Sequence, residues 1–80
     1  MKAKIIVTPR AEVLDPQGEA VRQGLLSLGY SGINHVRVGR YLELEVDGRD
    51  TEAVKASVQS MCEKLLANEV IEDFDFVVEP

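Results

Sequence analysis

The feature that most restricts the fold of this chain is a single cysteine, Cys62, in a sequence of only 80 residues. A domain of this size buries about 60–65% of the surface that its unfolded chain exposes, so one hydrophobic core gives marginal stability. Small domains compensate with disulfides, metals or a second subunit. One cysteine cannot form an intramolecular disulfide, and one cysteine with one histidine offers no metal-ligand pair at the usual spacings. We therefore predict a single domain over residues 1–80, with no metal site, that is stabilised as a homodimer or higher oligomer.

The composition excludes several classes of protein. Apolar residues make up 45% and charged residues 29%, which is typical of a globular domain. The net charge of −5 and the scattered lysines and arginines predict no nucleic-acid binding, which needs a basic surface. The apolar run at residues 5–7 is far too short for an export signal or a membrane span. We expect no membrane association and a cytoplasmic location.

Hydrophobic periodicity predicts the element order β-α-β-β-α-β. The expected strands cover residues 2–8, 33–38, 41–47 and 70–78, and the expected helices begin near residues 16 and 51. At the first helix, Asp15 can cap the free N–H groups and Pro16 suits the first helical position. Gly29 can adopt the left-handed backbone conformation that commonly ends a helix. Gly18 and Gly24 weaken this helix, and Gly24 could allow close packing against a strand.

The simplest arrangement is an α+β fold with two layers, in which two helices cover one face of a four-stranded antiparallel sheet. The second helix, from about Thr51 to Leu66, is expected to bury one stripe: Val54, Val58, Met61 and Leu65. The helices would cover the sheet face that carries Leu42, Leu44, Val46, Phe74 and Phe76. The opposite face would carry Tyr41, Val77 and Ile6, and we expect that face, or an edge strand, to bind a partner.

No group of residues in the sequence has the pattern of a catalytic site. His35 lies in a predicted strand with no nearby nucleophile, and Cys62 is expected to be a packed thiol in the second helix. The acids between Glu69 and Asp75 alternate along a strand, which divides them between two faces. Arg37 and Arg40 flank Gly39 at the predicted hairpin turn, where they could hold a phosphate or a partner carboxylate, or have a structural role.

Three segments, in this order and spacing, resemble the PurS family, the small subunit of phosphoribosylformylglycinamidine (FGAM) synthase. They are residues 13–21 (VLDPQGEAV), residues 36–40 (VRVGR) and residues 61–73 (MCEKLLANEVIED). The resemblance covers nearly the whole chain. Two positions depart from the family pattern, because Arg40 replaces a common lysine and Glu69 replaces a common proline. Arginine keeps the charge but changes the donor geometry, and without the proline the helix end depends on Asn68.

The resemblance implies a role in de novo purine biosynthesis. The complex would convert formylglycinamide ribonucleotide, glutamine and ATP to formylglycinamidine ribonucleotide. A glutaminase subunit (PurQ) would release ammonia, and a synthetase subunit (PurL) would use ATP and Mg²⁺. The PurS subunit would be non-catalytic, would carry no cofactor, and would bridge the other two while assisting ammonia transfer. Candidates for partner contacts are Arg37, Gly39, Arg40, Tyr41 and Asn68.

An alternative of a different class shares the same element order. Regulatory domains of the ACT type bind amino acids at dimer interfaces, usually through glycine-containing loops after the first strand. The corresponding loop here, residues 9–12, contains no glycine, and we expect no attached enzyme domain. Thermal stability of the isolated chain distinguishes the two alternatives, because only the ACT-like domain should be stabilised by a free amino acid.

Overall fold

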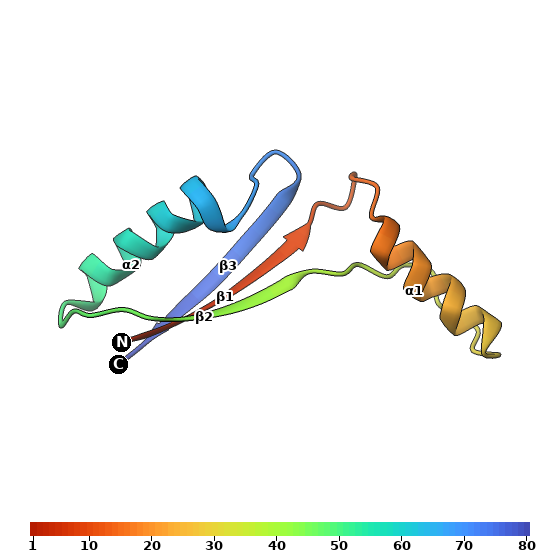
Figure 1. The fold of residues 1–80 in the computed structure, drawn as a ribbon, viewed down its shortest axis with the longest axis horizontal. Coiled ribbons are helices and arrows are strands. Elements are labelled where there is room, and N and C mark those ends of the chain that lie inside the picture. Colours follow the sequence, from red (N-terminus) through yellow and green to blue (C-terminus); the bar gives the residue numbers. More distant parts are fainter.

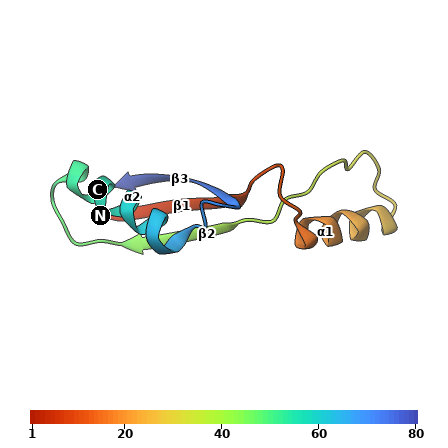
Figure 2. The same ribbon diagram turned by 90° about the horizontal axis from the view of Figure 1, so that it is seen from above.

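The computed structural model describes residues 1–80 as a three-stranded sheet, one helix packed on it, and a long arm that carries a second helix (Figures 1 and 2). The elements are β1 (Lys2–Pro9), α1 (Pro16–Ser27), β2 (Arg40–Glu45), α2 (Thr51–Met61), a π-helical turn η1 (Cys62–Leu66) and β3 (Glu72–Glu79). The α+β class is confirmed. No helix is both long enough and apolar enough to span a membrane.

Strand β1 lies at the centre of the sheet, in the order β2-β1-β3, and pairs antiparallel with both neighbours. Ile5 is opposite Leu42 on one side and Phe76 on the other, so these three side chains share the face that α2 covers. Ile6 is opposite Tyr41 and Asp75 on the other face, which no helix of the chain covers. The predicted division of the two sheet faces is therefore confirmed for these strands.

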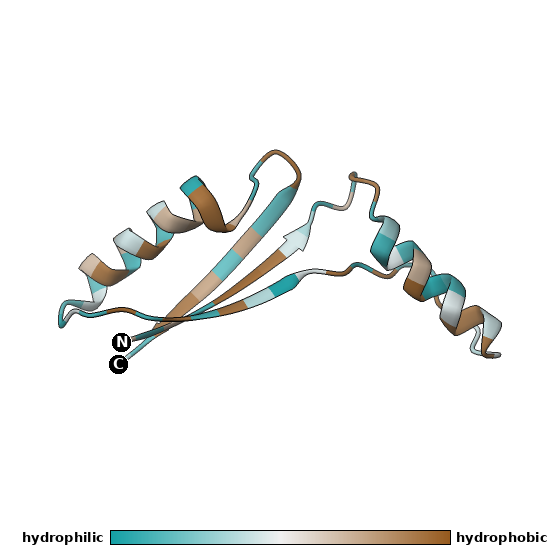
Figure 3. Cartoon of the chain, viewed as in Figure 1, coloured by the Kyte–Doolittle hydropathy of each residue, from teal (hydrophilic) through white to brown (hydrophobic).

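The buried core is small and lies between β1 and the helix formed by α2 and η1. Its seven residues are Ala3, Ile5, Val7, Val54, Val58, Cys62 and Ala67. Apolar residues of β2 and β3, including Leu42, Leu44 and Phe74, are only partly buried around it. Figure 3 shows apolar and polar segments alternating along the strands and along α2. An 80-residue chain with eight buried residues has little reserve of hydrophobic stabilisation.

The predicted buried stripe of the second helix is correct at Val54 and Val58 but wrong at Met61 and Leu65. Met61 is 37% exposed and Leu65 is 83% exposed, whereas Cys62 is fully buried. Cys62 follows Val58 by four residues, so α-helical spacing alone accounts for its burial in place of Met61. A π-helical turn begins at Cys62, and in it the Ala67 N–H donates to the carbonyl of Cys62 at 3.0 Å. This turn has more residues than an α-helical one, so it rotates Leu65 away from the expected face.

The arm, residues 10–39, departs most from the prediction. Helix α1 lies beyond the end of the sheet instead of on it, and residues 31–39 continue the line of β2 toward α1 (Figure 1). The radius of gyration is 16.1 Å, compared with about 12 Å for a compact chain of this length. The predicted hairpin and fourth strand are therefore wrong for the single chain. Gly39 has no positive φ, which a two-residue hairpin turn would require.

Helix α1 nevertheless begins and ends as predicted. Asp15 is its N-cap, Pro16 is its first residue, and Gly29 has φ +96° just after its end. The close approach occurs at Gly18, not Gly24. A Cβ on Gly18 would collide with the carbonyl of Val36, whereas a Cβ on Gly24 would meet nothing within 4 Å. Helix α1 therefore packs through Gly18 against the extended segment at Val36.

Candidate functional site

The five residues predicted to contact partners do not form one site. Arg37 lies in a hollow of the arm, Arg40 and Asn68 line a corner between η1 and β3, and Tyr41 lies on the open sheet face. Gly39 lies against the carbonyl of Val7, where a Cβ would collide with it. The chain therefore offers three separate surfaces, of which the corner and the open face share strands β2 and β3.

The corner surface is organised by the Arg40 side chain. Its Nη2 donates to the carbonyl of Leu66 at 3.0 Å and to Glu72 Oε1 at 2.8 Å. Glu72 Oε1 also accepts from the backbone N–H of Asn68 at 2.8 Å, and the Asn68 carbonyl accepts from the N–H groups of Ile71 and Glu72. These bonds join the end of η1 to β2 and β3. Arg40 is thus a structural residue of this corner, a role that the sequence left open.

Two exposed apolar side chains lie beside this network. Leu65 and Val70 are 83% and 80% exposed and line a shallow hollow of about 520 Å³ together with Arg40 and Asn68. Neither was among the predicted contact residues, because Leu65 was assigned to the buried stripe. The sequence feature that could have indicated this surface is Val70, an apolar residue in the polar loop that follows Asn68. An apolar pair with a charged rim is typical of a protein contact surface.

We expect Arg40→Ala to lower the free energy of unfolding by about 1 kcal/mol, because the Arg40 side chain is partly exposed and solvent weakens its ion pair with Glu72. Arg40→Lys should recover part of the loss, since a lysine can reach one of the two acceptors but lacks the planar geometry. Urea denaturation at fixed protein concentration measures both. Equal stability of all three proteins would show that the corner network contributes nothing.

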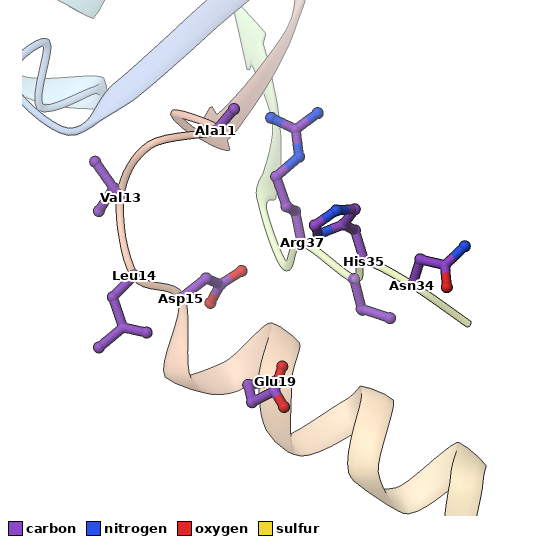
Figure 4. Close-up of a pocket in the computed structure, with 9 residues that line it drawn as sticks. Ala11, Val13, Leu14, Asp15, Glu19, Asn34, His35 and Arg37 are labelled. Atoms are coloured by element: carbon purple, nitrogen blue, oxygen red, sulfur yellow. The ribbon is translucent and has the colours of Figure 1, made fainter. Parts of the chain in front are cut away.

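The arm surface is a hollow of about 380 Å³ between the 10–15 loop, the start of α1 and residues 34–37 (Figure 4). Asp15 joins its two walls: Oδ1 accepts from the Gly18 N–H at 3.0 Å, and Oδ2 accepts from the Val38 N–H at 2.8 Å. Arg37 donates to the carbonyl of Pro9 at 3.1 Å. No serine or cysteine lines the hollow beside His35, so it holds no nucleophile for that imidazole to activate.

The same hydrogen bonds lower the pKa of Asp15, the Val38 N–H contributing most and the Gly18 N–H next. The pKa of Glu19 is lowered to about 2, first by its hydrogen bond with Arg22 and then by that with Gln23. Asp15 is partly buried and Glu19 is exposed, so solvent reduces the energetic consequence. The Asp15 carboxylate joins the start of α1 to residue 38, whereas the Glu19 carboxylate bonds only within α1.

We expect the contact between α1 and residues 36–38 to weaken as the pH falls below about 4. A lowered native pKa means that the unfolded state binds protons more readily, so the stabilisation is present above the unfolded pKa and is lost toward lower pH. The protection factor of the Val38 amide, which is its exchange corrected for the intrinsic rate at each pH, measures this between pH 7 and pH 3. The Asp15→Asn variant should exchange faster at pH 7 and should lose most of the pH dependence. A variant with the wild-type profile would exclude Asp15 as the cause.

The third surface is the open sheet face. Ile6, Tyr41 and Val77 are each more than half exposed and surround a hollow of about 180 Å³. The Tyr41 hydroxyl donates to Glu43 at 2.9 Å, and partial burial together with this carboxylate raises the pKa of Tyr41. Charged residues frame the apolar centre, with ion pairs Lys2–Glu43 at 3.8 Å and Lys4–Glu79 at 2.6 Å.

Cys62 is fully buried in the core, as predicted, and burial followed by the nearby Glu63 carboxylate raises the pKa of its thiol. A thiol of raised pKa is a weak nucleophile. No group of three or more histidine, cysteine, aspartate or glutamate side chains converges on a possible metal position.

These features define a class: a small α+β domain that presents three separate hollows on its surface. The family model described as PurS, phosphoribosylformylglycinamidine (FGAM) synthase, matches residues 2–80. The chain belongs to the PurS family. The resemblance found in its three sequence segments is thereby confirmed.

Relatives and solved structures agree with this membership. The PurS subunit of Bacillus subtilis is 46% identical over 78 residues, which are 98% of this chain and 92% of the relative. The subunit of Synechocystis is 45% identical over 75 residues, which are 94% and 75% of the two chains. A solved structure of B. subtilis PurS matches with a TM-score of 0.84 and covers 99% of this chain and 98% of that one. A chain in the structure of PurLQS from Thermotoga maritima matches at 32% identity with a TM-score of 0.85, covering 95% of this chain and 93% of that chain.

Proposed function

We propose that this chain is the non-catalytic small subunit of FGAM synthase and acts in de novo purine (IMP) biosynthesis. The observation that carries the proposal is the match, over 95% of the chain, to a subunit of the T. maritima PurLQS assembly. A PurS of Methanocaldococcus jannaschii, 35% identical, is described as one of the subunits of formylglycinamide ribonucleotide amidotransferase. The three separate surfaces suit a subunit that must contact more than one protein.

In this proposal the activity belongs to the complex. A glutaminase subunit, PurQ, hydrolyses glutamine and a synthetase subunit, PurL, uses ATP and Mg²⁺ to add the ammonia to formylglycinamide ribonucleotide. The present chain contributes no catalytic group and no cofactor. It bridges the two enzymes in the cytoplasm as a homodimer or higher oligomer, and it assists the passage of ammonia by fixing their relative position.

Reconstitution from purified subunits tests the proposal. We expect the chain to co-elute with the glutaminase and synthetase in the presence of glutamine and nucleotide, and to be required for glutamine-dependent formation of the amidine product. Ammonia-dependent synthesis should persist without it, because the synthetase site does not include this chain. Failure to co-elute, with full glutamine-dependent activity in its absence, would overturn the proposal.

A set of variants tests whether the corner surface binds the enzyme partners. Leu65→Ser and Val70→Ser remove apolar groups that the single chain leaves exposed, so each should fold normally yet bind the enzyme partners at least fivefold more weakly if the corner surface is used. Lys55→Ser on the outer side of α2 is the matched control. Stabilisation of the isolated chain by a free amino acid would instead support the ACT-like alternative, which family membership does not favour.

A further inference from the structure

The two exposed apolar side chains of the corner surface, Leu65 and Val70, are presented by specific local structures. The π-helical turn η1 directs Leu65 outward, and π-helical turns occur frequently at functional sites. Val70 lies in the turn between η1 and β3, in which the Asn68 carbonyl accepts from the Ile71 N–H at 3.0 Å. Both side chains line the same hollow, so the chain presents them as one apolar patch.

The turn that carries Val70 is held by hydrogen bonds within the chain. The Asn68 side chain accepts from the Val70 N–H at 3.1 Å, and the Asn68 N–H donates to Glu72 Oε1 at 2.8 Å. Arg40 of β2 holds the same Glu72 carboxylate through its ion pair at 2.8 Å. Because these bonds order the turn in the free chain, a partner does not have to order it on binding, and more of the contact energy is retained as affinity.

The corner surface also contains the free carbonyl end of a helix. The N–H groups that follow η1 donate to Cys62, Glu72 and the Asn68 side chain. None of them donates to the carbonyls of Lys64 and Leu65, which lie at the end of the helix. The carbonyl end of a helix carries a partial negative charge and attracts cations.

The charged side chains of the hollow add to this negative potential. Five of them line it: Arg40, Glu63, Lys64, Glu69 and Glu72. Arg40 and Glu72 neutralise each other in their ion pair, which leaves two carboxylates, those of Glu63 and Glu69, against the single ammonium of Lys64. An excess of negative charge therefore surrounds the apolar patch.

We propose that the corner surface binds a segment of one of the two enzyme subunits in which an apolar side chain is adjacent to a lysine or arginine. The apolar side chain lies between Leu65 and Val70, and the cation approaches the Glu69 carboxylate and the free carbonyls of the helix end. This inference rests on the proposed function, because it specifies the chemistry of one contact in that complex. A second copy of this chain is a poor occupant, since it carries the same acidic turn and a net charge of −5.

Neutralising variants at two positions of the hollow determine the sign of the partner's charge. Glu69→Gln removes a carboxylate and Lys64→Gln removes an ammonium. The measurement is the concentration of labelled chain that gives half-maximal assembly with glutaminase and synthetase, by fluorescence anisotropy with glutamine and nucleotide present. We expect Glu69→Gln to raise this concentration about 3- to 10-fold, whereas Lys64→Gln leaves it unchanged or lowers it up to about threefold.

Glu52→Gln is the matched control for these variants. Glu52 is an exposed carboxylate in the first turn of α2, at the opposite end of this helix from the corner surface. The change in net charge is the same as in Glu69→Gln, so an effect of overall charge would appear equally in both. We expect Glu52→Gln to assemble like the wild type, and circular dichroism to show that all three variants are folded.

Photocrosslinking identifies the bound segment directly. Val70→Cys provides one accessible thiol, because Cys62 is fully buried, and it is labelled with a benzophenone maleimide, which is itself apolar. On irradiation of the assembled complex we expect a crosslinked peptide of glutaminase or synthetase that contains a lysine or arginine next to an apolar residue, identified by mass spectrometry. Lys55→Cys on the outer side of α2, labelled in the same way, should not give this peptide.

Four results would overturn the inference. They are a greater loss in Lys64→Gln than in Glu69→Gln, which indicates an acidic segment; no change in either variant; a crosslinked peptide without lysine or arginine; and a crosslink to a second copy of this chain. In each of these cases the wild-type chain still assembles with the enzymes, so the proposed function stands. Failure of the wild-type chain to assemble would instead overturn the proposed function, and the inference with it.

Discussion

Replacement of Ile5 by alanine should lower the free energy of unfolding by about 2–5 kcal/mol, enough to unfold much of the protein at physiological temperature. Ile5 is fully buried in the middle of β1, between Leu42 and Phe76 and beneath α2. The cost includes the lost burial of the side chain and the cavity left behind. It is large relative to the total because the core contains only seven residues.

The neighbouring Ile6 provides a matched control. The same change, Ile6→Ala, removes a side chain that is 54% exposed on the open sheet face, so we expect a loss below about 1 kcal/mol. Urea denaturation followed by circular dichroism, at one fixed protein concentration, measures both variants, because oligomerisation makes stability depend on concentration. Equal losses at the two positions would mean that the assembled protein buries the open face as deeply as the core.

The second large effect is expected at Gly18. A methyl group there would collide with the carbonyl of Val36 and lie 2.6 Å from Asp15 Oδ2, so Gly18→Ala must push α1 away from residue 36. We expect a loss of about 1–3 kcal/mol, with faster amide exchange at residues 36–38. The loss should appear in spite of the higher helix propensity of alanine.

Gly24→Ala is the control in the same helix. Nothing lies within 4 Å of the added Cβ, so only helix propensity changes and stability should rise by about 1 kcal/mol. Opposite signs at two glycines of one helix would demonstrate that tertiary contact, not propensity, determines the effect at Gly18. A stabilising Gly18→Ala variant would show that α1 does not pack on residue 36.

The local elements of this fold were predictable because their signals are local. Alternation in β2 and β3 and the cap at Asp15 require no information beyond neighbouring residues, and the structure confirms them. The stripe of the second helix was predicted only as far as Val58. Beyond that point Cys62, four residues after Val58, occupies the core in place of Met61, a choice between spacings of three and four that the pattern leaves open. Leu65 is exposed because the π-helical turn that begins at Cys62 changes the helical periodicity, which the sequence pattern does not signal.

The candidate contact residues, several of them close in sequence, lie in different places on the structure. Arg37 and Arg40 are three residues apart, but the extended chain at Gly39 directs one toward the arm hollow and the other toward the corner of η1 and β3. Glu72, the acceptor that positions Arg40, lies 32 residues further along the chain. Such a pair depends on the path of the backbone, so spacing along the sequence could not reveal it.

The lone cysteine and the short length determined by themselves that this chain must depend on burial, with no disulfide, and that its own core would be marginal. Only the tertiary structure decided which apolar surfaces the single chain leaves exposed. Hydrophobic periodicity predicts which side chains are buried. The pattern is the same whether the residues that bury them belong to the same chain or to another. The extended backbone at Gly39 resolves that ambiguity, because it carries α1 and residues 31–39 away from the sheet they were expected to complete.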